Sequence, residues 1–293
     1  MKKVVCMVLA AVMLMACLAG CGSTTASTPE DSASAAFKIG GTAPLTGGAA
    51  IYGNAVKNAA QIAVDEINAK GGIQFELRYE DDQNDPEKAV NAYNTLKDWG
   101  MQLSLGSVTS KPCEVTSGDT FADRIFALTP SASSVATTEG KDNQFQMCFT
   151  DPNQGASAAE LVSTKYTGSK VGIIYDSSDD YSTGLYNGFK AKAAELGVEI
   201  VATTSYTADN KADLSTQVTQ CQDAGADLVF LPIYYTEASQ ILTYANRISY
   251  APKFFGCDGM DGILTMEGFD TSLAEGLALM TPFDANATDE ATQ

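Results

Sequence analysis

Short apolar segments alternate with amphipathic segments from residue 37 onward, and this alternation constrains the fold more than any other feature of the sequence. The apolar segments have the length of strands, and the segments between them carry apolar residues three and four positions apart, as one face of a helix does. Strict alternation of strand and helix predicts parallel sheets covered by helices on both faces. We therefore predict an α/β fold whose parallel sheets are doubly wound.

The alternation falls into two series, which predicts two lobes joined by a hinge, with ligands at the carboxyl ends of the strands. We place the break at Asp151-Pro152, where we expect a change of direction. Residues 151–281 then form lobe 2, and residues 37–150 together with 282–293 form lobe 1. The polar tail from Asp284 to Gln293 is typical of a helix start, so we expect lobe 1 to be incomplete. The alternative is one large sheet.

Capping residues predict where several helices begin. Asn54 is expected to cap a helix that ends at Gly71-Gly72. Asp85-Pro86 joins an N-cap residue to a proline at the first helical position, and it predicts the start of the next helix. The apolar face expected for the first of these helices consists of Val56, Ala59, Ala60, Ala63 and Ile67.

The N-terminus has the layout of a lipoprotein signal peptide. Two lysines precede an apolar segment that is too short to span a membrane, and Leu-Ala-Gly-Cys closes it at Cys21. We expect residues 1–20 to be removed, Cys21 to carry the lipid, and residues 21–36 to be a flexible linker. Two acyl chains hold a protein stably at a membrane. The predicted location is the outer face of the cell membrane. The alternative is ordinary cleavage and release, with Cys21 incidental.

Composition excludes several classes of function. The net charge is −18, which repels nucleic acid, and no basic segment with interleaved aromatic residues occurs. The chain contains no histidine, so Ser-His-Asp and Cys-His catalytic arrangements are excluded. Neither a phosphate-binding loop nor close metal-ligand spacing is present, and we expect no cofactor and no metal.

Four cysteines remain beyond the predicted signal and lipid site. Their wide spacing contains no C-x-x-C motif, and an exported location permits disulfides without selecting a pairing. Buried free thiols are an equal alternative. These cysteines are Cys113, Cys148, Cys221 and Cys257.

Five segments carry a family resemblance: 39–53, 65–86, 106–110 with 129–133, 175–184, and 234–237 with 256–259. Together they resemble the periplasmic leucine/isoleucine/valine-binding protein family, the extracellular solute-binding components of ABC transporters for branched-chain amino acids. The resemblance runs from Phe37 to the C-terminus. It implies the type I periplasmic binding fold and a ligand that is an amino acid.

The ligand implied is a zwitterion, which needs donors for its carboxylate. The loop around Ser110 offers backbone N–H groups at a helix N-terminus together with a hydroxyl, which suits an anion. The resemblance implies that Ser110 holds the ligand carboxylate, and that the loop of Ser131, Ala132 and Ser133 binds both ends of the ligand's backbone. The alternatives are that Ser110 only caps its helix and that residues 131–133 form a simple turn.

The ammonium group of the ligand needs an acceptor. Asp258 directly follows an apolar strand, and a carboxylate there suits a charge-assisted hydrogen bond to an ammonium. The alternative is an N-cap role for Asp258. The resemblance also places Tyr52, Tyr181 and Tyr234 along the cleft as apolar walls with hydroxyls, with Tyr235 as the alternative to Tyr234.

The sequence therefore predicts a membrane-anchored binding protein that captures a branched-chain or aliphatic amino acid between two lobes and delivers it to membrane permease subunits. A second hypothesis is a sensor for another amino acid or small amide. A third is a hydrolase that uses Ser110 with Lys111 as base. Neighbouring side chains of this kind point apart, which disfavours that pair.

Overall fold

The structure is a computed structural model that describes residues 36–282 and residue 288. The predicted signal peptide, its lipidation site at Cys21 and nearly all of the predicted linker lie outside the described residues, as do most of residues 282–293. The described residues belong to one compact unit that begins at Ala36. Within this described part, no helix is long and apolar enough to cross a membrane.

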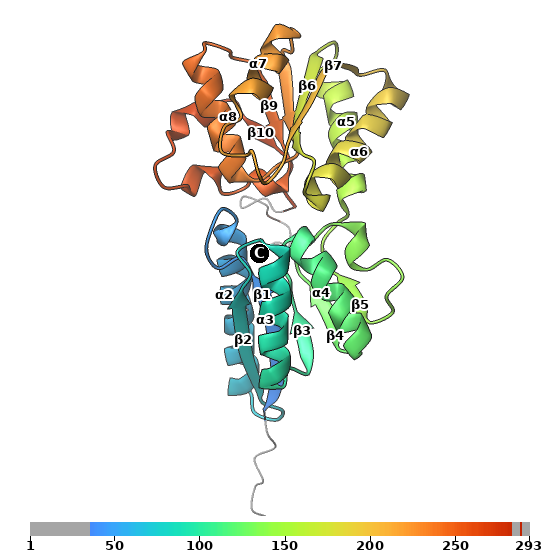
Figure 1. Cartoon of the computed structure of the whole chain (residues 1–293), viewed down its shortest axis with the longest axis vertical. Helices are drawn as coiled ribbons and strands as arrows, with labels where there is room; N and C mark the ends of the chain where they lie inside the picture. The colour runs from blue at the N-terminus through green and yellow to red at the C-terminus, as the bar shows by residue number, and fades with distance from the viewer. Residues whose placement is uncertain (1–35, 283–287, 289–293) are drawn as a thin grey trace, which may run out of the picture. The chain divides into compact units, whose positions relative to one another are not determined.

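Two parallel sheets organise the described chain, as predicted (Figure 1). The first sheet has five strands in the order β2-β1-β3-β4-β5. Every pair in it is parallel, and β1 carries β2 on one side and β3 on the other. Its strands are β1 (Phe37–Ala43), β2 (Phe75–Asp81), β3 (Leu103–Leu105), β4 (Phe126–Thr129) and β5 (Gln144–Gln146).

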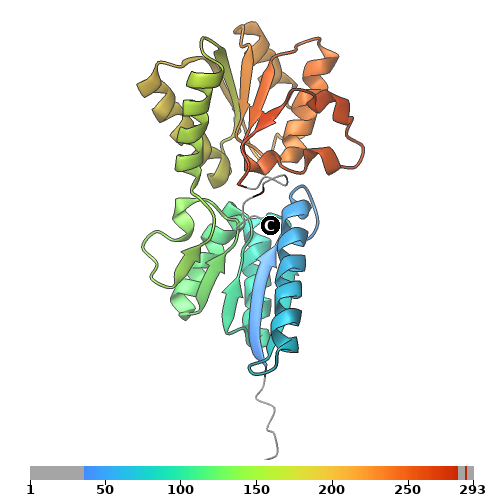
Figure 2. The same cartoon turned by 180° about the vertical axis from the view of Figure 1, so that it is seen from behind.

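Helices lie on both faces of the first sheet. α2 covers one face and α3 and α4 cover the other, as the front and rear views in Figures 1 and 2 show. α3 begins as predicted: the Asp85 side chain accepts a hydrogen bond from the Lys88 N–H at 2.9 Å, and Gly100 ends the helix at φ 91°. The elements are α2 (Ala50–Ala69), α3 (Pro86–Trp99), α4 (Ser110–Asp123) and the short 3-10 helix η1 (Val135–Thr137).

The predicted start and the predicted apolar face of α2 are both wrong. The helix begins at Ala50, and the Asn54 side chain lies inside its first turns, donating to the carbonyls of Leu45 and Ala50. Gly53 allows this earlier start, because a Cβ there would lie 2.1 Å from the Pro44 carbonyl oxygen. Of the five residues expected on the buried face none is fully buried, and the buried positions of α2 are Gly53 and Val64.

The second sheet repeats the topology of the first. Its order β10-β9-β8-β6-β7 places β6 between its sequence neighbour β7 and β8, just as β1 lies between β2 and β3. All of its pairs are parallel. Its strands are β6 (Lys170–Asp176), β7 (Glu199–Tyr206), β8 (Leu228–Leu231), β9 (Lys253–Gly256) and β10 (Ala278–Leu279).

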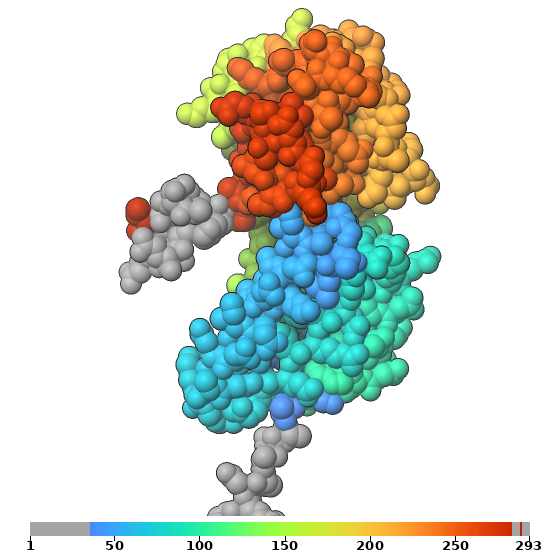
Figure 3. Space-filling view, turned by 90° about the vertical axis from the view of Figure 1, so that its left-hand side faces the viewer, coloured from blue at the N-terminus to red at the C-terminus, as the bar shows by residue number. Residues whose placement is uncertain are grey.

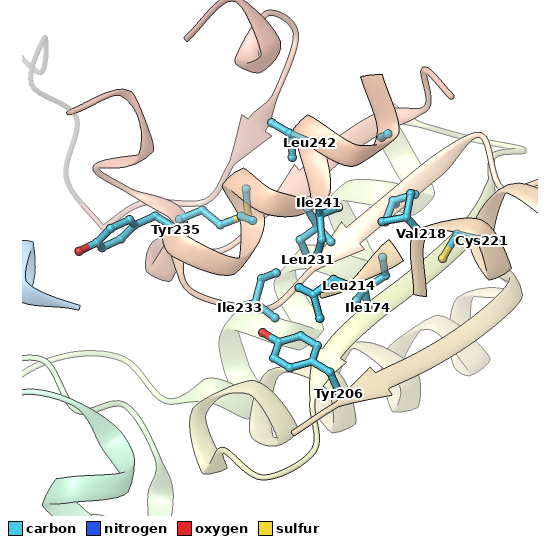
Figure 4. Close-up of a cluster of buried hydrophobic side chains, with 14 of the residues drawn as sticks. Ile174, Tyr206, Leu214, Val218, Cys221, Leu231, Ile233, Tyr235, Ile241 and Leu242 are labelled. Carbon is cyan, nitrogen blue, oxygen red and sulfur yellow. The ribbon is translucent and has the colours of Figure 1, made fainter. Parts of the chain in front are cut away.

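Helices α5 and α6 cover one face of the second sheet, and α7 and α8 cover the other (Figure 1). Alternation along β6 divides the core between these faces: Ile173 packs toward α5 and α6, and Ile174 packs toward α7 and α8. Figure 4 shows the second of these clusters, in which Tyr235 from the start of α8 is one of the packed side chains. The elements are α5 (Asp151–Lys165), α6 (Asp180–Leu196), α7 (Ser215–Asp223), α8 (Tyr235–Arg247), and the 3-10 helices η2 (Asp258–Met260), η3 (Ile263–Thr265) and η4 (Thr271–Ala274).

Glycines bring α5 and α6 into close contact. A Cβ at Gly155 would lie 2.2 Å from the Leu185 carbonyl oxygen, and one at Gly188 would lie 2.4 Å from the Pro152 carbonyl oxygen. Larger side chains at these positions would force the helices apart. This close packing holds the first residue of α5, Asp151, against Gly184 of α6, where an added Cβ would lie 2.7 Å from the Asp151 Cβ.

The start of α2 contacts the second lobe directly. The Thr236 hydroxyl donates to the Gly48 carbonyl at 2.8 Å, and the Tyr52 hydroxyl donates to the Gly259 carbonyl at 2.6 Å. Figure 3 shows this contact, with α2 in blue below the orange-red segment of lobe 2. Across the lobes, Lys111 of α4 also forms an ion pair with Asp180 of α6 at 2.7 Å.

Candidate ligand-binding site

A small cavity lies where the strand-end loops of both sheets meet. Its residues follow β1, β3 and β4 of the first sheet and β6, β8 and β9 of the second. In each sheet the strand order reverses at a central strand, and such a switch point is where open parallel sheets bind ligands. The cavity is lined by Tyr52, Val108, Thr109, Ser110, Ser131, Ser133, Tyr181, Tyr234, Asp258 and Gly259.

Ser110 joins two of these loops. It is the first residue of α4, while the N-cap position belongs to Thr109 and makes no side-chain cap hydrogen bond. The Ser110 hydroxyl oxygen accepts hydrogen bonds from the backbone N–H groups of Ser133 and Ser134, both at 3.1 Å. Because a hydroxyl also carries one donor proton, Ser110 can still donate to a carboxylate in the cavity.

The loop after β4 contributes unequally to the cavity. Ser131 and Ser133 line it, whereas Ala132 is buried beside it. The Ala132 N–H donates to the Thr129 hydroxyl at 3.0 Å, and the Ala132 carbonyl accepts from the Cys148 thiol at 3.3 Å. Ala132 therefore shapes the loop, and Ser131 and Ser133 present polar atoms to the cavity.

Asp258 lies at the opposite side of the cavity, at the carboxyl end of β9. It is the first residue of η2, and the N-cap position belongs to Cys257. The Tyr181 hydroxyl donates to Asp258 Oδ1 at 2.9 Å and accepts from the Gly259 N–H at 2.8 Å. Burial raises the pKa of Asp258, and the Tyr181 hydrogen bond offsets part of that effect.

Three tyrosines form the aromatic wall of the cavity. The rings of Tyr181 and Tyr234 stack at 4.8 Å between centroids, and Tyr52 packs on Tyr234 at 6.1 Å. Tyr235 is 4% exposed and packs against Tyr52 of the first lobe at 5.7 Å between ring centroids, outside the residues that line the cavity. Of the two alternatives at this position, Tyr234 is the one that reaches the cavity.

Sequence reasoning missed Asp151, the most unusual polar group beside the site. It is 1% exposed, and neither carboxylate oxygen has a hydrogen-bond partner among the described residues. Its backbone N–H donates to the Ser133 carbonyl at 3.0 Å, which fixes it beside the loop after β4. Burial raises the pKa of Asp151 to about 8, the adjacent Ser133 side chain offsets part of that effect, and the nearby Asp258 carboxylate adds to it. An unpaired buried carboxylate is costly unless a cation meets it.

The cavity between these residues measures about 20 Å³. One buried water needs about 10–15 Å³ on a comparable measure, so the space admits one water-sized group and no amino acid side chain. A larger cavity of about 230 Å³ adjoins it, and Tyr234 lines both. The side chain of a bound amino acid must therefore extend into that neighbouring space or move the lobes apart.

The geometry does not favour a Ser110–Lys111 catalytic pair. The Lys111 ammonium donates to Asp180 Oδ2 at 2.7 Å, in the opposite lobe. This hydrogen bond raises the pKa of Lys111, so the amine stays protonated and is a poor base.

All four cysteines of the described residues are free thiols. No cluster of histidine, cysteine or acidic side chains in that part of the chain could hold a metal ion.

Two parallel-sheet lobes with a polar and aromatic site at their facing strand ends define the class of two-lobed binding proteins. The chain belongs to the periplasmic binding protein family, whose model matches residues 36–293. This confirms the family resemblance and the fold class.

Relatives and solved structures agree with this assignment. The Leu/Ile/Val-binding protein BraC3 of Rhizobium johnstonii is 33% identical over 232 residues, which cover 78% of this chain and 63% of that protein. The crystal structure of the branched-chain amino acid substrate-binding protein LivJ from Streptococcus pneumoniae, in complex with isoleucine, is 26% identical with a TM-score of 0.79. That match covers 87% of this chain and 74% of the other. The chain spans about 63% of the length of the first curated relatives that it matches.

Proposed function

We propose that this protein is the solute-binding component of an ABC transporter, working outside the cytoplasm, and that it captures an amino acid between its lobes for delivery to membrane permease subunits. Branched-chain and aliphatic amino acids are the first candidates, because relatives are named as Leu/Ile/Val-binding proteins. The protein acts by binding and release, without catalysis.

The observation that carries this proposal is the separation of donors and acceptors across one cavity. Ser110, Ser131 and Ser133 line the cavity on one side, and their hydroxyls are possible donors. Asp258 supplies a carboxylate on the other, with buried Asp151 next to it. A zwitterion presents its carboxylate and its ammonium close together, so it can satisfy both sides at once.

Capture is coupled to closure because the contacting groups come from both lobes. Ser110 and Tyr52 belong to the first lobe, whereas Tyr181, Tyr234 and Asp258 belong to the second. A ligand that bridges them stabilises the closed arrangement over the open one, and only such differential contact can shift the equilibrium. The closed arrangement is the form that the permease would recognise.

Attachment to the membrane through lipid on Cys21 is part of the proposal. The lipoprotein signal at residues 1–20 and the polar linker at 21–36 support it. Replacing Cys21 with serine is expected to move the protein from the membrane fraction to the soluble extracellular fraction. Membrane retention of the Cys21→Ser variant would contradict lipidation at this residue.

Calorimetric titration of the purified chain with leucine, isoleucine, valine and glutamate tests the ligand class. We expect binding of the aliphatic amino acids and loss of that binding when the α-carboxylate is replaced by an amide, as in leucinamide. Equal binding of leucine and leucinamide would contradict the proposal that the Ser110 side holds the ligand carboxylate.

A sensor remains the alternative to a transporter component, and genes for a permease and an ATPase beside this one would favour transport.

A further inference from the structure

The chamber next to the amino-acid site has a chemistry that the proposed function does not use. It measures about 230 Å³ and lies among the strand-end loops of both lobes. Tyr234 lines both spaces, and the consecutive residues Ser110 and Lys111 line one each. The two spaces are therefore neighbours that share the Tyr234 ring as a wall.

The walls of the chamber carry five charged side chains: Lys111, Asp176, Asp179, Lys211 and Glu237. Both lysines are already neutralised: Lys211 pairs with Glu237 at 3.0 Å, and Lys111 pairs with Asp180 at 2.7 Å. Asp176 and Asp179 have no lysine or arginine partner among the described residues. The chamber is therefore left with an excess of negative charge at these two carboxylates.

Asp179 is the less satisfied of the two. It caps α6 through one hydrogen bond from the Ser182 N–H, which is long at 3.4 Å. Asp176, in contrast, accepts from both the N–H and the hydroxyl of Ser178, at 2.8 Å and 2.6 Å. Burial, with Asp176 and Asp180 adding to it, raises the pKa of Asp179 to about 7, as expected for a crowded carboxylate that an incoming cation would relieve.

We infer that the ligand side chain occupies this chamber, and that the protein binds amino acids whose side chain ends in a cation, such as arginine and lysine. This inference rests on the proposed capture of an amino acid. The Tyr234 ring and Ile233 at the chamber wall contact the aliphatic stem, which long basic side chains share with aliphatic ones. The cationic end meets Asp179 and Asp176. The ligand range thus extends beyond the aliphatic amino acids.

Calorimetric titration of the purified chain with arginine, lysine, methionine and leucine tests this inference. Methionine matches the unbranched stem without the charge. We expect arginine and lysine to bind more tightly than methionine. Asp179→Asn removes the charge but keeps an N-cap residue, and it should weaken arginine binding by about tenfold or more while leaving leucine and methionine unchanged. Asp176→Asn should also weaken arginine binding, and it replaces Asp179→Asn as the test variant if that variant fails to fold.

A matched control is Asp270→Asn. Asp270 is an exposed aspartate that caps η4 through the Ser272 N–H, and it lies outside the chamber. This variant should leave arginine binding unchanged. Arginine that binds no more tightly than methionine, or that is insensitive to both Asp179→Asn and Asp176→Asn, would overturn the inference, while retained leucine binding would leave the proposed function intact. If no amino acid binds, both this inference and the proposed function fail.

Discussion

The two sides of the candidate site are built on opposite principles. On the first lobe, the Ser110 hydroxyl already accepts two backbone hydrogen bonds at 3.1 Å, so the donor side is held in place by its own contacts. On the second lobe, Asp151 is fully buried without a hydrogen-bond partner among the described residues, and Asp258 depends on the Tyr181 hydroxyl. One side is satisfied before any ligand arrives, and the other carries an electrostatic cost.

This difference indicates where binding free energy originates. A preorganised donor side loses little conformational entropy when the ligand binds, and it gains one charge-assisted hydrogen bond. A buried carboxylate that gains a cation recovers a desolvation cost already incurred in folding. We therefore expect the acidic side to dominate affinity and the hydroxyl side to set the orientation of the ligand.

The largest effect is expected for Asp258→Ala. The change removes the carboxylate that lines the cavity, so the ligand ammonium loses its charged acceptor and Tyr181 loses its partner. Losing one member of a buried charge pair costs about 2–5 kcal/mol, so affinity for leucine should fall roughly a hundredfold. Titration calorimetry measures this directly. Asp270→Asn is the matched control, and unchanged affinity in Asp258→Ala would remove this residue from the site.

Asp151→Asn should separate binding from stability. Leucine affinity should fall about tenfold, because the second acceptor loses its charge. The protein itself should become more stable near pH 8, since the variant removes a buried carboxylate that no described cation pairs with. About 1 kcal/mol corresponds to roughly 2–4 °C in a domain of this size, and thermal unfolding resolves that shift. A lower melting temperature together with unchanged leucine affinity would contradict both the destabilising effect of Asp151 and its role in ligand binding.

The sign of this pH effect follows from the raised pKa. Asp151 has a pKa of about 8 in the folded protein against an ordinary value of 3.8. Between these values the folded protein holds a proton that the unfolded chain has released, so stability falls as pH rises from about 4 to about 8. Asp82 and Asp179, each with a pKa raised to about 7, act in the same direction. Asp151→Asn should therefore reduce the fall in melting temperature without abolishing it.

Ligand binding should also release protons near neutral pH. Asp151 is mostly protonated at pH 7 in the free protein, and a neighbouring ammonium favours its ionised form. We expect up to about one proton released per leucine bound, measured by calorimetry in buffers of different ionisation enthalpy. The release should be smaller in Asp151→Asn than in the wild-type protein. Proton uptake, or a release that the substitution leaves unchanged, would show that Asp151 is not a titrating partner of the ligand.

The sequence predicted the architecture well because the architecture depends on local patterns. Strand and helix alternation, with stops such as Gly100 at φ 91°, leads directly to two parallel sheets. The start of α2 could not be predicted in this way, because Ala49 and Ala50 carry no capping signal. Its position follows from the contact of Gly53 with the Pro44 backbone, which only the folded chain shows.

The candidate site shows the same division. Residues at strand ends, such as Ser110 and Asp258, were accessible to sequence reasoning because strand ends in parallel sheets meet at one edge. Asp151 was noticed only as half of an Asp-Pro pair at a turn. Its burial results from the close packing of α5 on α6 through Gly155 and Gly188, a contact between helices that no local pattern encodes. A helix-start aspartate facing a glycine-rich helix is the one signal that could have indicated it.

The smallest effect is expected where the lobes meet through charge alone. Lys111 and Asp180 pair at 2.7 Å, but their side chains are 36% and 33% exposed. An ion pair with this exposure is worth about 0–1 kcal/mol and is screened by salt. Lys111→Met should therefore weaken leucine binding by less than about fivefold, and raising the ionic strength should bring the wild-type protein to the same affinity. A loss as large as that of Asp258→Ala, unaffected by salt, would mean that charge contacts between the lobes, and not the acidic side of the site, dominate affinity.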